Sequence, residues 1–129
     1  VNTILNSGSI NINTAGVWMP VGPGLSFIKE SNSSTIEAEL LSRVFYSGGS
    51  ANGVYFRVQI IGQTATFFTQ AAARGANNTD FVVAKSFFDS LPAGSYSARV
   101  HARTVNGTAT GVLLDPGGYR GTILVTERL

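Results

Sequence analysis

The chain has 129 residues, enough for one domain whose core buries roughly two thirds of the surface of the unfolded chain. Charged residues make up 12% of it, against about 25% in an ordinary globular protein. The polar share falls instead to Gly, Ser, Thr and Asn, which favour strands and turns over helices, so coiled coils, helical bundles and charged tails are excluded. We expect a single all-β domain over residues 1–129.

Charge and cysteine content narrow the classes of partner and cofactor. Nine Lys and Arg against seven Asp and Glu give a formal charge of +2, and the basic residues are scattered, so we expect no nucleic-acid partner. The absence of cysteine excludes disulfides, thiol catalysis and Cys-based metal sites. No apolar run approaches the ~18 residues of a membrane-spanning helix, so we expect no membrane insertion.

The first predicted strands flank a segment rich in glycine and proline. One strand lies around Ile10 and Ile12, and the next covers residues 25–28. Residues 22–24 are Gly-Pro-Gly, which typically interrupts regular structure. We therefore predict a break in the chain directly before the second strand.

Residues 34–46 are the best helix candidate, since they include Glu-Ala-Glu-Leu-Leu. Read with a period of two, however, Ile36, Ala38, Leu40 and Val44 share one face, and the charged side chains share the other. This alternation is typical of a half-buried strand. We predict one long strand here.

Two later segments alternate more clearly. Residues 53–61 alternate Val, Phe and Ile with polar side chains, and residues 96–104 alternate small apolar side chains with Arg99, His101 and Arg103. The second strand is thus predicted to have a small core face and a basic outer face. Further strands are predicted at residues 64–69, 81–88, 110–114 and 122–127, which makes eight or nine in all.

The connections carry turn residues. Asn52-Gly53 and Asn106-Gly107 are typical of hairpin turns with positive φ. Leu-Pro-Ala-Gly at 91–94 and Pro-Gly-Gly at 116–118 also predict breaks between strands. The loops at residues 47–53, 73–80 and 115–120 are predicted to supply contacts to a partner.

Eight or nine strands without a helix predict a two-sheet antiparallel jelly-roll sandwich. An immunoglobulin-like sandwich is the main alternative, but such domains have about seven strands in about 100 residues. True members also carry a Cys-Trp-Cys core, which a chain without cysteine lacks. The jelly roll is therefore favoured.

Three segments resemble a known group of jelly rolls. Residues 91–103 (LPAGSYSARVHAR) lead through a Gly- and Thr-rich hairpin to residues 121–127 (GTILVTE), and residues 53–59 (GVYFRVQ) look like a central strand. This pattern, over about half of the chain, resembles the tumour-necrosis-factor-like and complement-globular-head domains, including their bacterial and phage relatives. The resemblance implies a compact homotrimer whose inner sheets pack around a threefold axis.

The composition favours the same assembly. Leu41 and Phe45 lie opposite the Leu40 and Val44 face of their predicted strand, and Phe87 and Phe88 point opposite ways. A subunit interface would bury such residues, although apolar residues scattered over a surface are also normal. We predict a homotrimer.

Glu37 and Glu39 lie on one strand face, about 7 Å apart. Two carboxylates at such a separation suit glycoside hydrolysis, but they normally come from different strands in a deep cleft. The alternative, which we favour, is pairing with Arg43, Arg57, Arg99 or Arg103 across strands or subunits. A small hydrolase that uses these glutamates remains the third hypothesis.

His101 is the one histidine, between Arg99 and Arg103 on the same predicted face. Protonation between two guanidinium groups is unfavourable, so His101 would act as a pH switch if it lay at an interface. The simpler interpretation is a neutral surface histidine. We assign Glu37, Glu39, Arg99, His101 and Arg103 to a candidate subunit interface.

Trp18 and Tyr119 lie in Gly- and Pro-rich segments, where an exposed aromatic ring can stack on a sugar. The alternative for Trp18 is that it closes one end of the sandwich. Three Asn-x-Ser/Thr sequons, at 32, 77 and 106, matter only in a host that glycosylates secreted proteins.

These observations predict a non-enzymatic trimeric head that acts in assembly or surface recognition, in an extracellular, cell-surface or virion-surface location. The alternative is a monomeric, lectin-like carbohydrate-binding module. No nucleophile elbow, phosphate loop or dinucleotide fingerprint occurs, so we expect no catalytic residue and no cofactor. No Asp-x-Asp spacing indicates a metal, although a calcium site built from loops stays open.

Overall fold

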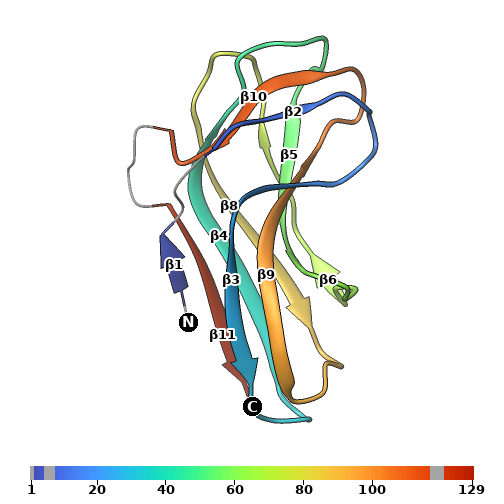
Figure 1. The fold of residues 1–129 in the computed structure, drawn as a ribbon, viewed down its shortest axis with the longest axis vertical. Helices are drawn as coiled ribbons and strands as arrows, with labels where there is room; N and C mark the ends of the chain where they lie inside the picture. The colour runs from blue at the N-terminus through green and yellow to red at the C-terminus, as the bar shows by residue number, and fades with distance from the viewer. Residues whose placement is uncertain (1, 5–7, 117–120) are drawn as a thin grey trace.

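Two antiparallel sheets pack face to face around one apolar core, as Figure 1 shows. The computed structural model describes residues 2–4, 8–116 and 121–129, and within these ranges the chain forms strands and no helix. The predicted all-β sandwich is confirmed. The strands are β1 (Asn2–Ile4), β2 (Ile10–Ile12), β3 (Met19–Lys29), β4 (Thr35–Phe45), β5 (Val54–Ile60), β6 (Phe67–Phe68), β7 (Ala71–Ala73), β8 (Asp80–Phe88), β9 (Gly94–Arg103), β10 (Ala109–Leu114) and β11 (Thr122–Arg128).

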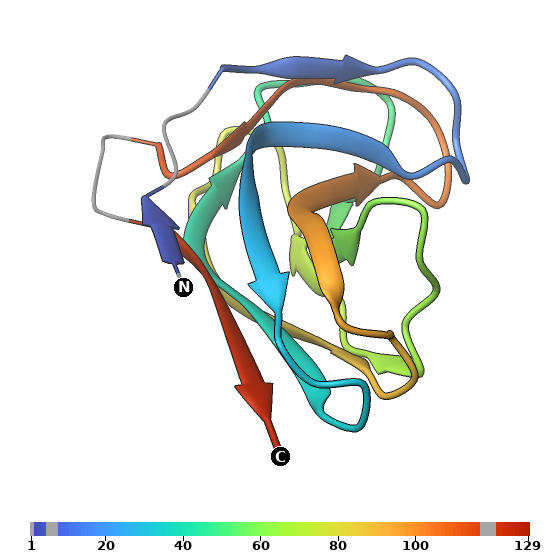
Figure 2. The same ribbon diagram turned by 60° about the horizontal axis from the view of Figure 1, so that its bottom comes forward.

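The strand order is that of a jelly roll. In the seven-stranded sheet β4 pairs with β11, β10 and β8, to which β1, β2 and β6 add in turn. The four-stranded sheet has the order β3-β9-β5-β7. The connections β3–β4, β4–β5, β7–β8, β8–β9 and β9–β10 each pass from one sheet to the other, as Figure 2 lets the reader follow.

Alternation along the central strands builds the core. On β5, Val54, Phe56, Val58 and Ile60 are fully buried, while the side chains between them reach the surface. Burial of a side chain of this size contributes about 1.5–3 kcal/mol. The alternation predicted for residues 53–61 is thus confirmed, and it sends every second side chain of β5 to the outer face of the four-stranded sheet.

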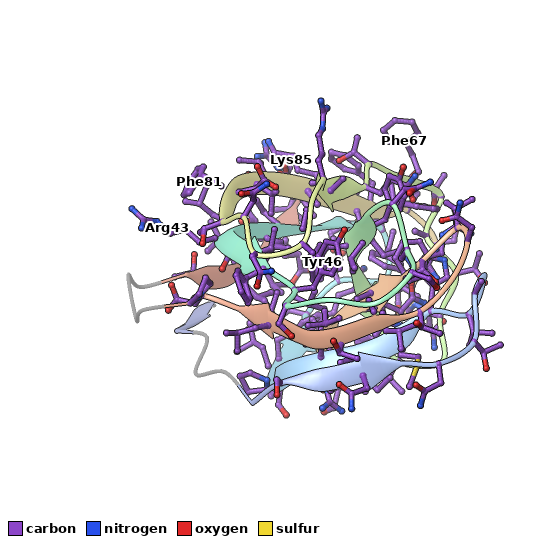
Figure 3. All side chains as sticks on the ribbon, turned by 90° about the horizontal axis from the view of Figure 1, so that it is seen from above. Arg43, Tyr46, Phe67, Phe81 and Lys85 are labelled. Atoms are coloured by element: carbon purple, nitrogen blue, oxygen red, sulfur yellow. The ribbon has the colours of Figure 1, made fainter. Side chains whose placement is uncertain are left out.

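Polar side chains inside the sandwich have partners. Ser86 on β8 is fully buried, and its hydroxyl donates to the carbonyl oxygen of Val58 on β5 at 2.6 Å, which connects the two sheets. Tyr46 lies between the sheets (Figure 3), and its hydroxyl donates to the carbonyl oxygen of Ala51 at 3.3 Å. Both bonds offset the cost of removing a hydroxyl from water.

The predicted long strand at 34–46 is confirmed as β4, but other predicted bounds were wrong. Gly-Pro-Gly at 22–24 does not interrupt the chain, because β3 runs through it. A shift in the pairing with β9 between Val21 and Leu25, together with φ of 74° at Gly22, accommodates the extra residues. The strand predicted at 64–69 shortens to β6, and β1 and β7 were not predicted.

The two Asn-Gly turns are not hairpins. β4 and β5 lie in different sheets, and so do β9 and β10, so each turn carries the chain across the sandwich. The turns meet there, since the backbone N–H of Asn52 donates to Oδ1 of Asn106 at 3.4 Å. Gly107 has φ of 67°, and a Cβ on it would lie 2.8 Å from the backbone nitrogen of Ala51, so only glycine fits.

Candidate functional site

The outer face of the seven-stranded sheet carries exposed apolar side chains. Leu41 pairs with Val83 across β4 and β8, and Phe81 and Leu124 lie on the same side. Phe81 is 65% and Val83 is 47% exposed. Figure 3 shows Phe81, Lys85 and Phe67 projecting away from the sheets on one side. We call Leu41, Phe81, Val83 and Leu124 the apolar face.

A compact charge cluster adjoins the apolar face. The pairing of β4 with β8 sets Glu39 opposite Lys85, whose ammonium lies 3.4 Å from Glu39 and 3.2 Å from Glu37. On the other side Arg128 donates from Nε and Nη2 to one oxygen of Glu37, each at 2.6 Å. Two carboxylates and two cations therefore balance, within the same chain.

The Glu37 carboxylate is held in its ionised form. Glu37 is only 7% exposed, and burial alone would raise its pKa. The hydrogen bonds and positive charges of Lys85 and Arg128 outweigh that effect, and the pKa lies below its usual value. The hollow beside Glu37 and Glu39 measures only about 100 Å³, far below the range of ligand sites.

Three of the expected arginine partners of these glutamates, Arg57, Arg99 and Arg103, do not pair with them within the chain. Arg57, Arg99 and Arg103 belong to β5 and β9 in the four-stranded sheet, on the opposite side of the molecule. The described ion pairs of Glu37 and Glu39 go to Lys85 and Arg128 instead. Pairing between subunits stays a prediction.

The outer face of the four-stranded sheet is basic and hollowed. Strand pairing sets Arg57 opposite His101 and Gln59 opposite Arg99, so that side chains far apart in sequence become neighbours. They line a hollow of about 440 Å³, within the usual size of a small-molecule site. This basic groove is lined by Trp18, Pro20, Arg57, Gln59, Ile61, Gly62, Arg99 and His101.

Trp18 lies against the arginines of this face. Its ring centroid is 4.3 Å from Cζ of Arg57 and 4.9 Å from Cζ of Arg103. Phe68 adds a second ring, 4.7 Å from Cζ of Arg57 and edge-on to Trp18. Trp18 is half-buried beside the groove, and it owes this position to cation–π contacts on the outer face of the sheet.

The positive charge of the basic groove is uncompensated. Within the described parts of the chain no ion pair involves Arg57, Arg99, Arg103 or His101. Arg99 donates from Nε to the carbonyl oxygen of Gly22 at 2.8 Å, whereas Nε of Arg57 and of Arg103 is buried without a hydrogen bond. Like charges thus face one another around the hollow.

The surroundings of the groove lower the pKa of both the His101 imidazole and the Arg57 guanidinium. Burial, and then the charges of Arg57 and Arg99, lower the pKa of His101 below its usual value, so the imidazole is neutral near pH 7. Burial, and then Arg103, lower the pKa of the Arg57 guanidinium, which stays charged. Proximity of His101 to the arginines was predicted, and Arg57 adds to it from β5.

A second, uncharged hollow continues the basic groove. It measures about 620 Å³ and shares Ile61 with the groove. Its polar side chains are neutral hydroxyls and one amide. The hollow is lined by Ser26, Phe27, Ile28, Ile61, Gln63, Ser95, Tyr96 and Ser97.

The predicted interface residues form two groups that do not meet within one chain. Glu37 and Glu39 lie beside the apolar face, and Arg99, His101 and Arg103 lie on the basic side. Tyr119, a predicted ligand contact, lies outside the described residues, as do Gly117 and Gly118. Arg57 and Gln59 were missed as groove residues, although their alternation with buried side chains signalled an exposed polar face.

Residues 2–4, 8–116 and 121–129 contain no group of three His, Asp or Glu side chains arranged to hold a metal ion. These same ranges hold no helix of the length and apolarity needed to cross a membrane.

Comparison with known proteins reveals a similarity of fold. No protein-family model and no curated protein matches this sequence. Among solved structures, a chain of the tripod (BppUct-A-L) from the baseplate of bacteriophage Tuc2009 matches with a TM-score of 0.57 and 15% identity. The match covers 92% of this chain and 62% of that chain, so this chain spans less than two thirds of its length. The two chains share a β-sandwich fold.

Proposed function

We propose that the chain is a non-enzymatic jelly-roll head, which assembles as a homotrimer on a virion surface and serves in assembly or receptor recognition. The fold similarity to a phage baseplate tripod component supports this role and location. The resemblance to tumour-necrosis-factor-like and complement-globular-head domains supports three copies around an axis. The apolar face is the observation that carries the proposal.

The apolar face has the chemistry of a subunit interface. Leu41 and Val83 are direct cross-strand partners, Phe81 lies two residues along β8, and Leu124 lies diagonal to Leu41, so the four are near neighbours. Arg43 and Glu39 border them, opposite Phe81 and Leu124. Such patches are uncommon on monomers, and obligate interfaces resemble the apolar cores of domains. The adjoining glutamates are neutralised by Lys85 and Arg128, so their burial at an interface leaves no uncompensated charge.

The arrangement of titratable groups supports a role without catalysis. A glycosidase needs one carboxyl group with a raised pKa as its acid, whereas the pKa of Glu37 is lowered. His101 lies near Arg57 and Arg99, and within the described residues no ion pair joins it to a carboxylate that could orient it as a general base.

Light scattering coupled to size exclusion tests the trimer. We expect a mass of about three times 13.6 kDa for the wild-type chain and a monomer for Val83→Glu, which places a charge in the apolar face. Ile28→Glu is the matched control, because Ile28 is 69% exposed on the other sheet. A monomeric wild-type chain, or equal dissociation of both variants, contradicts the proposal.

A carbohydrate-binding module is the second candidate. The position of Trp18 beside a hollow of about 440 Å³ supports it, since an aromatic side chain can pack against a sugar ring. Sugar-dependent change in Trp18 fluorescence tests this candidate separately from the mass. A saturable response supports the module, and no response to any sugar removes it.

A further inference from the structure

We propose that the basic groove binds an anionic saccharide, a sugar that carries a carboxylate or a phosphate, with its neutral remainder in the adjoining hollow. The proposal rests on the recognition role proposed above and names the ligand class. Packing through the apolar face would leave this groove open, since it lies on the other sheet.

The need for a negative charge follows from the uncompensated cations. Arg57, Arg99 and His101 line one hollow, and no described carboxylate pairs with any of them. Among residues 2–4, 8–116 and 121–129, no counterion offsets their mutual repulsion. A carboxylate or phosphate in the hollow would remove that repulsion and accept forked hydrogen bonds from a guanidinium.

The need for a sugar follows from what surrounds those cations. Trp18 and Ile61 give the groove apolar surface, and Gln59 and the neutral His101 offer hydrogen bonds to hydroxyl groups. Arg57 is itself held between Trp18 and Phe68, at 4.3 and 4.7 Å from the ring centroids. The cation is therefore positioned before a ligand arrives, which reduces the entropy that binding costs.

The second hollow distinguishes a saccharide from a polyanion. A nucleic acid carries a phosphate at each nucleotide and needs cations along its whole length. Beyond Ile61 the hollow is lined by serine hydroxyls, the Gln63 amide, Tyr96 and the apolar Phe27 and Ile28, and these lining residues include no cation. A cationic hollow followed by an uncharged one, with hydroxyl, amide, aromatic and aliphatic side chains, matches an oligosaccharide with its acid group at one end.

Fluorescence titration is the direct test, because Trp18 is the one tryptophan of the chain and lines the groove. The probes are glucose, glucuronate, glucose 6-phosphate, inorganic phosphate and a short single-stranded DNA at matched ionic strength. We expect glucuronate or glucose 6-phosphate to bind at least about tenfold more tightly than glucose and than inorganic phosphate. Whichever acidic sugar binds more tightly identifies carboxylate or phosphate as the natural charge.

Matched variants separate a built site from general charge attraction. Arg57→Gln with Arg99→Gln should weaken binding of the acidic sugar at least about tenfold. The matched comparison uses single variants: Arg74→Gln removes one guanidinium at an exposed position outside the groove and should leave binding unchanged, whereas Arg99→Gln should weaken it. Circular dichroism checks that each variant is folded. If the Arg57→Gln, Arg99→Gln double variant is unfolded, the single Arg99→Gln variant replaces it, with a smaller expected loss of affinity.

Each remaining outcome overturns the proposal. Equal affinity for glucose and the acidic sugars leaves a neutral carbohydrate-binding module without the charge requirement. Equal affinity for inorganic phosphate, or tighter binding of DNA, removes the sugar. Equal weakening by Arg99→Gln and Arg74→Gln removes the groove. The mass of the same samples reports the trimer independently, so failure of one proposal is distinguishable from failure of the other.

Discussion

The two outer faces of the sandwich differ in whether their charged side chains have counterions in the same chain. Beside the apolar face, Glu37 and Glu39 meet Lys85 and Arg128, so the charges cancel within one chain. On the basic side, arginines surround His101 without a described counterion. Since both faces come from alternation on paired strands, the difference lies in which residues the register sets opposite one another. A balanced face tolerates burial against another protein surface, and an unbalanced one favours an anion.

The strongest way to break this contrast is to unbalance the balanced face. Glu37→Lys leaves Lys85, Arg128 and the new lysine close together, and we expect the free energy of unfolding to fall by about 3 kcal/mol, because a buried counterion is replaced by a like charge. Urea denaturation at fixed protein concentration measures the loss. Light scattering should also show a weakened trimer.

Glu30→Lys is the control for that variant. It makes the same change in net charge at an exposed position whose side chain has no described partner. We expect a change within about 0.5 kcal/mol. If both variants lose the same stability, net charge rather than the local cluster is responsible, and the contrast between the faces loses its basis.

A change between the faces should lower stability without altering either face. Ser86→Ala removes the hydroxyl that bridges from β8 to Val58 on β5, and we expect a loss of about 1–2 kcal/mol. Ser97 is partly exposed and no hydrogen bond of its hydroxyl is described, so Ser97→Ala is the matched control. Unfolding monitored by circular dichroism measures both, and an equal loss would rule out the bridge as the cause.

Trp18→Ala tests how much the cation–π contacts of the basic face contribute to stability. The variant removes the ring beside Arg57 and Arg103, and we expect a loss of about 1 kcal/mol, since both guanidinium groups lose the contact with Trp18 while Arg57 keeps the one with Phe68. Trp18→Phe, which keeps an aromatic ring, should lose less. Thermal unfolding followed by circular dichroism compares the two, and equal losses would mean that the contact contributes only through packing.

Local periodicity predicted the faces but not their neighbours. The alternation of Val54, Phe56 and Val58 with polar residues was read correctly because burial on one side imposes a period of two. Gly-Pro-Gly at 22–24 was misread because a bulge in β3 absorbs what would otherwise break a strand. β7 was missed because its three alanines carry little strand preference.

The basic groove depends on information that a local pattern does not hold. Arg57 meets His101 only through the register of β5 with β9, across more than forty residues of sequence. Trp18 reaches both arginines from the segment before β3. The sequence indicated one strand with a polar outer face and one with a basic outer face. It did not indicate that they are adjacent, because strand pairing in a jelly roll links segments distant in the chain.

The smallest expected effects are changes of stability with pH, which occur in a different pH range for each face. His101 has a lowered pKa in the folded chain, caused first by burial and then by Arg57 and Arg99. The unfolded chain therefore takes up this proton first, and stability falls as the pH drops below about 6.5, until folded His101 is also protonated. His101→Gln should abolish this step and leave the rest of the profile unchanged.

Glu37 acts in a lower window. Burial raises the pKa of Glu37, but the hydrogen bonds and charges of Lys85 and Arg128 lower it by more. The folded carboxylate therefore resists protonation more than the unfolded one does. Its stabilisation is present above about pH 4.5 and is lost as the pH falls through the lowered pKa, a window that Glu127 shares because backbone and Ser34 hydrogen bonds lower its pKa too. Melting temperatures across both windows should show two steps, with Glu37→Gln reducing only the lower one. A single step removed by either variant would mean that the two faces titrate as one coupled system, against the separation of charge on which both proposals rest.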